Sequence, residues 1–417
     1  MQKKLEKLNI ELLAPAGDFE SLEAAIYFGA DAVYFAGKNF GLRQAADNFS
    51  NDDIVKAIKL CHSKGVKAYI ACNLFAKNSD ELGLIKYFKF LATAKPDALI
   101  ISDPGVLLLA KKYAKKIDIH LSTQSNTTSS MSANFWAKQG VKRIVLAREL
   151  SLLEIADIRQ KLPKTVELEA FGHGAMCVAY SGRCLISSFV SGRPANRGEC
   201  VQHCRYEYEI REKGYDDKSK FLTLAEDEKG SYILNSKDLN MINHILDMQN
   251  AGIVSLKIEG RAKTGYYVGN VVNAYRRAID FINSAGDSKN IPNELVDELY
   301  KSSHREYFTG FYFGDKNNSQ YLLASRPKAN YQFVAKVLSS DGEFIKAQLR
   351  NKIIIGNELQ ILSPDNNFNQ TIKIQEMFDD KNCEKNSPIT IANKVKQTIY
   401  IKSNIKLSDG DMLRKKL

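Results

Sequence analysis

The amino-acid sequence predicts an α/β protein whose larger part is a (β/α)8 barrel, a TIM-like barrel. Over roughly the first 285 residues, short apolar segments alternate with amphipathic segments, which is the pattern of strands alternating with helices. Eight of the apolar segments have the length of strands, and each is apolar nearly throughout, as expected for a parallel sheet covered on both faces. No G-x-G-x-x-G motif follows the first of them, which disfavours an open doubly wound sheet.

The predicted strands are, in order, Ile10–Ala14, Ala32–Ala36, Lys67–Cys72, Ala98–Ser102, Ile119–Thr123, Arg143–Ala147, Val166–Phe171 and Val254–Ile258. Helical patterns lie between them. One helix is expected to begin after Asp18, a residue type that caps helix N-termini, and another to end before Gly65, a residue type common just past helix C-termini.

The carboxyl ends of barrel strands carry the chemistry of barrel enzymes, and here they carry polar residues. Each of these residues can also be a loop residue or a helix cap without a functional role. They are Asn73, Asp103, Gln124, Arg148 with Glu149, Gly172 with His173, and Glu259 with Arg261.

The alternation fails between the seventh and eighth strands, where residues 172–252 replace the usual short crossover. A loop of this length inside a compact domain is usually functional. After the eighth strand, helices are expected at Tyr266–Ile282 and Asn293–Ser302. From about residue 331, short β-rich runs separated by Asp-Gly and Ser-Pro-Asp turns predict a small antiparallel β-barrel. We therefore expect a barrel domain over residues 1–330, with its inserted segment, and a C-terminal domain over residues 331–417.

The composition favours a protein outside the membrane with an anionic partner. Lys and Arg number 59 against 48 Asp and Glu, a formal charge of +11, which suits nucleic acid unless the charge is simply spread over the surface. Apolar runs stop well short of 18 residues, so no membrane span is expected. The first residues lack an apolar stretch of signal-peptide length, so we expect a cytoplasmic protein.

Four of the seven cysteines lie within 28 positions, at Cys177, Cys184, Cys200 and Cys204, amid glycines and arginines. An iron–sulfur cluster takes four thiolates at irregular spacing, whereas structural zinc sites usually pair two closely spaced cysteine knuckles. The spacing therefore favours a cluster over zinc, with unliganded thiols and a disulfide as weaker alternatives in a reducing compartment. The other cysteines are scattered and are expected to be packing residues; they are Cys61, Cys72 and Cys383.

Hydrolytic chemistry has little support from the residues themselves. Neither a G-x-S-x-G elbow nor an H-E-x-x-H helix is present. His173 and His203 bracket the cysteines and could be ligands or acid–base groups, but a lone loop histidine is more often structural.

Residues 169–187 read E-x-F-x-x-G-A-M-C-x-x-x-x-G-x-C-x-x-S, which resembles the signature of the collagenase-like peptidases of unassigned catalytic type, a peptidase U-family. Further matches in the same order extend the resemblance over nearly the whole chain. They are ELLAPAGDFESLEAAIYFGADAVYFAG, HLSTQSN, LAREL, NRGECVQHCR, NSKDL, KIEGR and HREYFTGF.

The resemblance is strongest to a branch of tRNA hydroxylases that use prephenate to make 5-hydroxyuridine at the wobble position. Other relatives hydroxylate a cytidine of ribosomal RNA, act as paired proteins in oxygen-independent ubiquinone hydroxylation, or are described as collagen-degrading proteases. The resemblance implies a 4Fe-4S cluster on Cys177, Cys184, Cys200 and Cys204, with zinc as the alternative, and prephenate as a co-substrate.

On this reading the partners are a tRNA and a small carboxylate donor. Arginine suits bidentate contacts to carboxylates, so Arg148, Lys257 and Arg261 are the candidate donor-binding residues. The candidate acid–base or positioning residues are Gln124, Glu169, His173 and Glu259. The candidate tRNA contacts are Arg193, Arg197, Arg205 and the terminal Arg414, Lys415 and Lys416, although the last three could instead be a frayed tail. The alternatives are a peptidase (hydrolase), a component of quinone hydroxylation, and a non-catalytic RNA-binding module.

Overall fold

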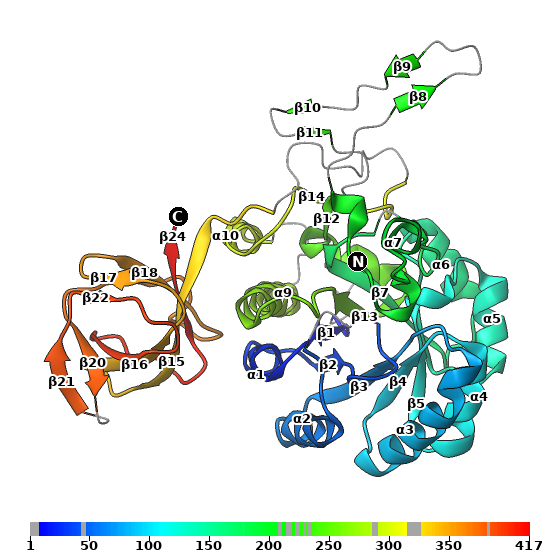
Figure 1. Cartoon of the computed structure of the whole chain (residues 1–417), viewed down its shortest axis with the longest axis horizontal. Helices are drawn as coiled ribbons and strands as arrows, with labels where there is room; N and C mark the ends of the chain where they lie inside the picture. The colour runs from blue at the N-terminus through cyan, green and yellow to red at the C-terminus, as the bar shows by residue number, and fades with distance from the viewer. Residues whose placement is uncertain are drawn as a thin grey trace, which may run out of the picture.

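A computed structural model of the chain contains a closed eight-stranded parallel barrel (Figure 1). It describes residues 8–42, 47–177, 179–206, 236–285, 291–314, 327–381 and 384–417, with short strands at 211–213, 219–221, 226–227 and 230–231. The barrel strands are β1 (Glu11–Pro15), β2 (Ala32–Phe35), β3 (Lys67–Cys72), β4 (Ala98–Ile101), β5 (Asp118–Leu121), β6 (Arg143–Val145), β7 (Glu167–Ala175) and β13 (Ile253–Ile258). Since β13 pairs in parallel with both β1 and β7, the sheet closes and the predicted (β/α)8 barrel is confirmed.

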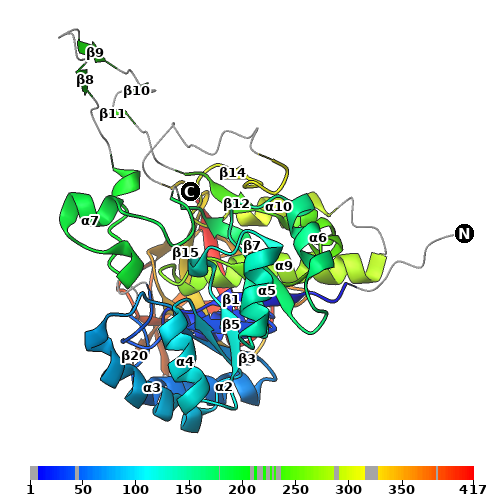
Figure 2. The ribbon, with the colours of Figure 1, turned by 90° about the vertical axis from the view of Figure 1, so that its right-hand side faces the viewer.

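Helices surround the barrel (Figures 1 and 2). They are α1 (Phe19–Tyr27), α2 (Asn51–Ser63), α3 (Glu81–Ala94), α4 (Pro104–Tyr113), α5 (Ser130–Lys138), α6 (Leu152–Lys161), α8 (Ile245–Asn250) and α9 (Gly265–Ala285). Asp18 caps α1 as expected, because its side chain accepts a hydrogen bond from the Ser21 amide at 2.7 Å. Gly65 follows α2 with a φ of +71°, a conformation that glycine adopts readily.

The seventh strand is longer than the sequence predicts. β7 continues to Ala175, so residues 172–175, which the sequence analysis assigns to the inserted segment, belong to the strand. They are held there because β12 (Asp238–Asn240) pairs with them antiparallel, and β14 (Tyr307–Phe308) pairs in turn with β12. Beyond β7 the chain forms α7 (Ile186–Ser191) and two short turns of 3₁₀-helix, η3 (Ala195–Arg197) and η4 (His203–Arg205). Figure 2 shows α7 beyond the barrel strands, at one end of the barrel.

The C-terminal region is an antiparallel β structure with its own core, as predicted. Its main sheet contains β15 (Tyr331–Ser340), β16 (Phe344–Leu349), β18 (Glu358–Leu362), β19 (Thr371–Lys373), β20 (Met377–Lys381), β21 (Glu384–Pro388), β23 (Thr398–Lys402) and β24 (Met412–Lys416). β17 (Ile353–Ile354) and β22 (Ile391–Ala392) form a second, two-stranded sheet. Aliphatic side chains such as Val337, Ile345 and Leu413 fill the core between these strands.

The C-terminal residues overturn one expectation. Residues 412–416 form β24, which pairs with both β15 and β18, so they are not a frayed tail. Arg414 is fully buried and forms an ion pair with Glu298 of α10 (Asn293–Leu299), where its Nη2 lies 2.9 Å from Oε2. Its Nη1 also donates to Asn270 of α9 at 2.7 Å. Arg414 therefore joins the C-terminal region to the barrel and is not placed to contact RNA.

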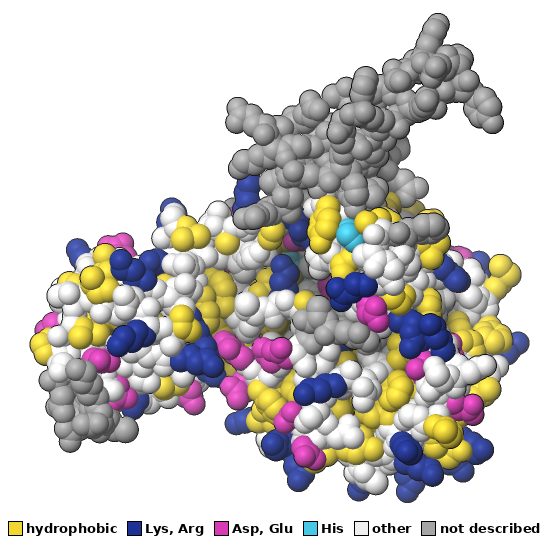
Figure 3. Space-filling model, viewed as in Figure 1, with side chains coloured by type: hydrophobic (Ala, Val, Ile, Leu, Met, Phe, Trp, Pro, Cys, Tyr) yellow, Lys and Arg dark blue, Asp and Glu magenta, His cyan; other side chains and the backbone are white. Residues whose placement is uncertain are grey.

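Two properties of the whole molecule bear on its partners. Among the described residues, none of the helices has the length and apolar character needed to cross a membrane. On the face shown in Figure 3, basic side chains are scattered over both regions and interleaved with acidic ones. On this face the positive charge is therefore not gathered into one broad patch.

Candidate active site at the barrel mouth

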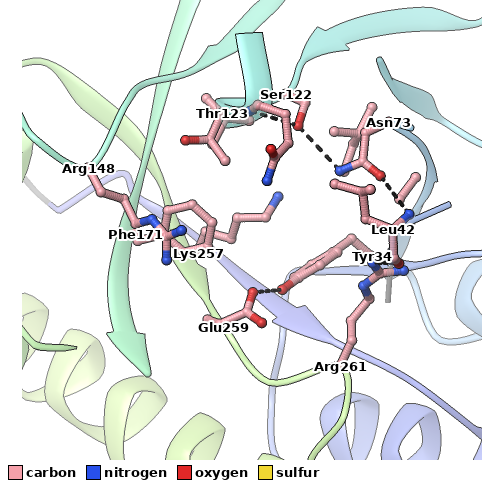
Figure 4. A pocket seen from close by; sticks show the side chains of 14 residues that line it. Tyr34, Leu42, Asn73, Ser122, Thr123, Arg148, Phe171, Lys257, Glu259 and Arg261 are labelled. Atoms are coloured by element: carbon pink, nitrogen blue, oxygen red, sulfur yellow. Dashed lines mark hydrogen bonds between the residues drawn. The ribbon is translucent and has the colours of Figure 1, made fainter. Parts of the chain in front are cut away.

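A cavity of about 570 Å³, including its opening, lies at the carboxyl ends of the barrel strands, and we call it the mouth cavity. Three cationic side chains and one acidic side chain are among its described lining residues, so it favours an anion. It is lined by Tyr34, Leu42, Ala71, Asn73, Ile100, Ser122, Thr123, Gln124, Val145, Arg148, Phe171, Lys257, Glu259 and Arg261 (Figure 4).

The cations reach the mouth cavity from different sides. In Figure 4 the Lys257 ammonium points into the middle of the cavity, while Arg148 and Arg261 enter from opposite sides. The Arg148 guanidinium lies 5.1 Å from the centre of the Phe171 ring and donates to the carbonyl of Ala175 at 3.3 Å. No described carboxylate forms an ion pair with Arg148, so its charge is available to a ligand.

Lys257 is held by a buried ionic network inside the barrel. Its Nζ lies 2.7 Å from Oε1 of Glu169, and the other Glu169 oxygen faces Arg143 at 3.4 Å. Arg143 is also bound to Glu11, the residue at the start of β1. The Glu169 carboxylate is fully buried and does not line the cavity. Glu169 is therefore placed to position the Lys257 ammonium, and not to exchange a proton with a ligand in the cavity.

Polar side chains shape the rest of the wall. Tyr34 donates to the Ile258 carbonyl at 3.0 Å and to Oε2 of Glu259 at 3.3 Å. Asn73 donates to Ser122 at 3.3 Å and accepts from the Leu42 amide at 3.2 Å, which ties the ends of β3 and β5 to the loop after β2. Arg261 donates to the carbonyl of Leu42. These contacts hold the cavity walls together.

The four predicted ligand cysteines line one cavity, which we call the cysteine cavity. It measures about 760 Å³ including its opening and contains two arginines but no acidic side chain among its described lining residues. It is lined by Leu42, Gln124, Arg148, Ala175, Met176, Cys177, Tyr180, Ser181, Gly182, Cys184, Ala195, Asn196, Cys200, Gln202, Cys204 and Arg205. Burial is the main cause that raises the pKa of both Cys184 and Cys204, so these thiols need a metal or another cation to ionise at neutral pH.

The first cysteine segment docks onto the ends of β5 and β6. The Ser181 amide donates to Glu149 at 2.9 Å, and the Ser181 hydroxyl donates to the same carboxylate at 3.2 Å. Gly182 packs so closely on Gln124 that a Cβ on it would lie 2.1 Å from the Gln124 carbonyl oxygen. The glycine in the Cys-x₆-Cys segment is therefore required by a close backbone approach.

The second cysteine segment is clamped to the loop after β3. Arg197 lies 2.9 Å from Asp80 and donates to the carbonyl of Phe75 at 2.7 Å. Asn196 donates to the carbonyl of Cys184 at 3.1 Å, which joins the two cysteine segments. The sequence predicts Arg197 as an RNA contact. In the structure its guanidinium instead binds Asp80 and the Phe75 carbonyl and so holds the second cysteine segment in place.

The mouth cavity and the cysteine cavity share a wall formed by Leu42, Gln124 and Arg148. Of the predicted residues, Gln124, Arg148, Lys257, Glu259 and Arg261 therefore meet at the mouth, and Arg205 joins the four cysteines. Arg193 is exposed and lines neither cavity.

The histidines lie outside both cavities. His173 is 1% exposed and is packed among Tyr267, Tyr275 and Tyr307, with ring-centre distances of 5.3–6.3 Å. Burial, with smaller effects of Lys263 and His304, lowers the pKa of His173 to about 3, so the ring is neutral in the fold. His203 stacks edge-on against Tyr206, at 4.7 Å between ring centres. Neither histidine is placed to exchange protons with a ligand of the mouth cavity.

Sequence reasoning missed Tyr34, Ser181 and the anchoring role of Glu149. Tyr34 could have been found from the two-residue period of β2, because Ala32 and Tyr34 both belong to the buried cluster inside the barrel. Ser181 carries no sequence signal, since its role depends on a contact with a residue 32 positions away.

Two predicted packing cysteines, Cys61 and Cys72, are buried, and burial raises the pKa of Cys61 to about 12. Cys383 lies outside the described residues. Among the described residues, no three His, Cys, Asp or Glu side chains converge closely enough to hold a single metal ion.

Fold and site together define a class: a (β/α)8-barrel protein in which a cationic mouth cavity adjoins a pocket of four cysteines. A model of peptidase family U32 matches residues 17–321, and a model of the peptidase family U32 C-terminal domain matches residues 329–414. The chain belongs to peptidase family U32, which confirms the resemblance seen in its motifs.

Relatives of the chain carry names of several kinds. tRNA hydroxylation protein P1 of Bacillus subtilis is 36% identical over 409 residues, covering 97% of this chain and 94% of the relative. tRNA hydroxylation protein P of Escherichia coli is 34% identical and covers 88% of this chain and 89% of the relative. A protein of Porphyromonas gingivalis named collagenase is 34% identical over 74% of each chain.

Proposed function

We propose that this chain is an RNA-modifying enzyme that hydroxylates the wobble uridine of tRNA at C5, with prephenate as co-substrate. The relatives that match nearly its whole length are named for tRNA hydroxylation. The observation that carries the proposal is the wall shared by the two cavities, because a cavity with three cationic side chains adjoins the cavity of the four cysteines.

The charges around the mouth cavity suit a small dicarboxylate such as prephenate. Arg148 is free of carboxylate partners among the described residues, and a guanidinium binds a carboxylate through two parallel hydrogen bonds. Lys257 and Arg261 add charge on other sides of the cavity, and Glu169 offsets part of it. Of the predicted acid–base or positioning residues, Gln124 and Glu259 line this cavity and can hydrogen-bond a ligand there.

We expect the cysteine cavity to hold an iron–sulfur cluster rather than a single zinc ion. Cys177, Cys184, Cys200 and Cys204 share one cavity without converging on one point, and a cluster offers well-separated metal corners. Arg148 and Arg205 line the same cavity and would stabilise the negative charge of thiolate ligands. When bound by these cysteines, the cluster would supply electron transfer or Lewis-acid activation of the oxygenated donor.

A peptidase is the second candidate, supported by the name of the collagenase relative. A serine or cysteine protease needs a base beside its nucleophile. Among the described residues, no histidine lines either cavity, so neither Ser122 nor the four thiols acquire the usual base.

The test is mass spectrometry of tRNA nucleosides from a bacterium whose own tRNA 5-hydroxylation genes are deleted and which expresses this chain. We expect 5-hydroxyuridine with the wild-type chain, and none with Cys184→Ala or Arg148→Ala. Cys61→Ala, which removes a buried cysteine outside the cavity, is the matched control and should retain the modification.

Two further measurements separate the candidates. Anaerobic purification followed by iron and sulfide analysis should show a four-iron cluster that is lost with Cys184→Ala and kept with Cys61→Ala. Zinc in its place, no restored 5-hydroxyuridine, and gelatin cleavage by the purified protein would together replace the proposed function with a peptidase.

A further inference from the structure

A cleft lies where the barrel meets the C-terminal region, and we call it the junction cleft. It is lined by Ala262, Lys263, Thr264, Tyr266, Tyr267, Ser303, Ala329, Tyr331, Gln332, Phe333 and Leu417. Figure 1 shows the junction itself, where α9 and α10 face β15 and β24. The volume of the cleft, about 400 Å³, falls in the range of about 300–1,000 Å³ seen for ligand sites.

The cleft offers aromatic rings beside a cation. Tyr266 of α9 stacks on Phe333 of β15 with ring centres 5.2 Å apart and planes 4° from parallel, which builds the floor across the two regions. Tyr331 is half-buried, and Lys301 and Arg414 each lie 5.4 Å from its ring centre. Aromatic rings with nearby cations are the surfaces on which unpaired bases stack.

Lys263 is the charged group of the cleft, and no described carboxylate is within ion-pair distance of its ammonium. The two acidic groups nearest to it are engaged elsewhere. Asp238 accepts a hydrogen bond from the Arg305 amide at 3.0 Å, and its carboxylate lies 3.7 Å from the Arg305 guanidinium. Glu259 accepts a hydrogen bond from the Tyr34 hydroxyl in the mouth cavity. Burial lowers the pKa of Lys263; of the charges around it, Asp238 raises this pKa and Arg305 and Arg205 lower it. A phosphate would add a direct partner for the ammonium, which none of the described carboxylates provides.

One loop connects the junction cleft to the mouth cavity. Glu259 and Arg261 line the mouth cavity, and the next residues, Ala262 to Thr264, line the cleft. The loop is held in place because the Lys263 amide donates to the Gly260 carbonyl at 2.9 Å and Tyr267 donates to the Glu259 carbonyl at 3.3 Å. Residues 259–264 therefore contribute to the lining of both cavities.

We infer that the junction cleft binds a single-stranded segment of the RNA substrate, with a base on Tyr331 and a phosphate on Lys263. The inference rests on the proposed function and adds to it the place where the RNA is held beside the reacting nucleotide. Charge complementarity selects the occupant, because a nucleic acid strand supplies both the anion and the flat ring that the cleft accepts.

The test is the affinity of the purified full chain for tRNA, measured by fluorescence anisotropy over a series of salt concentrations. Lys263→Ala should weaken binding about threefold to tenfold and reduce the slope of log Kd against log salt by about one. Lys161→Ala removes an equal charge from the outer face of α6 and should change neither quantity.

The stacking contact has its own variants. Tyr331→Leu keeps an apolar side chain but removes the ring, and should weaken tRNA binding at least about fivefold, whereas Tyr331→Phe should bind like the wild type. Circular dichroism melting of each variant shows whether the C-terminal region is folded. If Tyr331→Leu unfolds it, the binding and salt slope of Lys263→Ala decide. A short oligouridylate should compete with tRNA, while poly-glutamate and double-stranded RNA should not.

The failures of the two proposals are distinguishable. If the wild-type chain binds no tRNA, the proposed function fails together with this inference. If it binds tRNA but Lys263→Ala and Tyr331→Leu bind as tightly as the wild type with the same salt slope, the cleft is not the RNA site and the proposed function stands. Equal competition by poly-glutamate would also overturn the inference, because it would show attraction to charge alone.

Discussion

Individual charged residues inside the barrel set the character of the mouth cavity. Lys257 lines the cavity with its ammonium 2.7 Å from the carboxylate of Glu169, and Glu169 itself is fully buried beside Arg143. A buried carboxylate between two cations stabilises the fold, because removing it would leave a buried, poorly solvated cation without a partner.

Glu169→Gln should therefore lower the free energy of unfolding by about 3–5 kcal/mol and reduce tRNA modification. The double variant Glu169→Gln with Lys257→Met removes the stranded cation and should regain part of the lost stability without regaining activity. Urea unfolding of the wild type and of the two variants checks this. Equal stability of the single and double variants would show that Lys257 does not depend on Glu169.

Two glycines with similar backbone angles provide a matched test of the cysteine segment. Gly182 (φ +74°) faces the Gln124 carbonyl, which a Cβ would approach to 2.1 Å, whereas Gly192 (φ +69°) has no neighbouring atom within 4 Å of the same position. Both alanine variants carry the strain of a left-handed residue, which costs roughly 1–2 kcal/mol, but only one collides.

Gly182→Ala should displace the cysteine segment from the end of β5, and so lose cofactor iron and tRNA modification while the barrel stays folded. Gly192→Ala should keep both. Iron analysis after anaerobic purification and far-ultraviolet circular dichroism measure the two properties. Equal loss of iron in both variants would assign the effect to backbone strain alone.

At the scale of elements, the extension of β7 past the barrel organises the inserted segment. Its last residues pair with β12, and this places His173 among tyrosines of α9 and β14. The described charged groups that act on His173 are Lys263 and His304, which add to the effect of burial in lowering its pKa to about 3.

This burial links folding to pH. Between about pH 6.5 and pH 3 the unfolded chain binds a proton on His173 that the folded chain does not, so stability rises with pH in this window and is lost as pH falls. At pH 5.5 the loss from this residue should be about 1.4 kcal/mol relative to neutral pH. His173→Phe should reduce the difference between urea unfolding free energies at pH 7.5 and pH 5.5 by this amount. An unchanged difference would contradict the neutral, buried state of the ring.

At the scale of the whole molecule, one buried ion pair joins the barrel to the C-terminal region. Arg414 on β24 and Glu298 on α10 are both fully buried, and Lys301 also binds Glu298 at 2.9 Å. The pair forms one side of the junction that contains the cleft, so the relative placement of the two regions depends on it.

Arg414→Met should lower the free energy of unfolding by about 3 kcal/mol, because Glu298 would remain buried with only Lys301 as partner. Lys402→Met, which breaks the exposed pair with Glu376, should cost less than about 1 kcal/mol and is the control. Calorimetric melting of the two variants gives the comparison. Similar melting temperatures would show that the Arg414 pair does not hold the two regions together.

The order and type of the elements could be predicted from the sequence because they follow from local pattern. Apolar runs such as Lys67–Cys72 and caps such as Asp18 depend on residues within a few positions of each other. Boundaries set by distant partners could not be predicted. β7 extends to Ala175 because β12 pairs with it, and residues 412–416 form a strand because β15 and β18 lie on either side.

By itself the sequence determined the barrel, the antiparallel C-terminal region, the family and the set of four cysteines. Only the tertiary structure decided which polar residues share a cavity. Arg148 and Gln124 lie in the wall between the two cavities, whereas Glu169 and His173 are buried in the interior. Arg197 and Arg414 form structural ion pairs. The physical reason is that periodicity reports only which face of an element is apolar, whereas the partner of a charged side chain is set by the meeting of segments far apart in the chain.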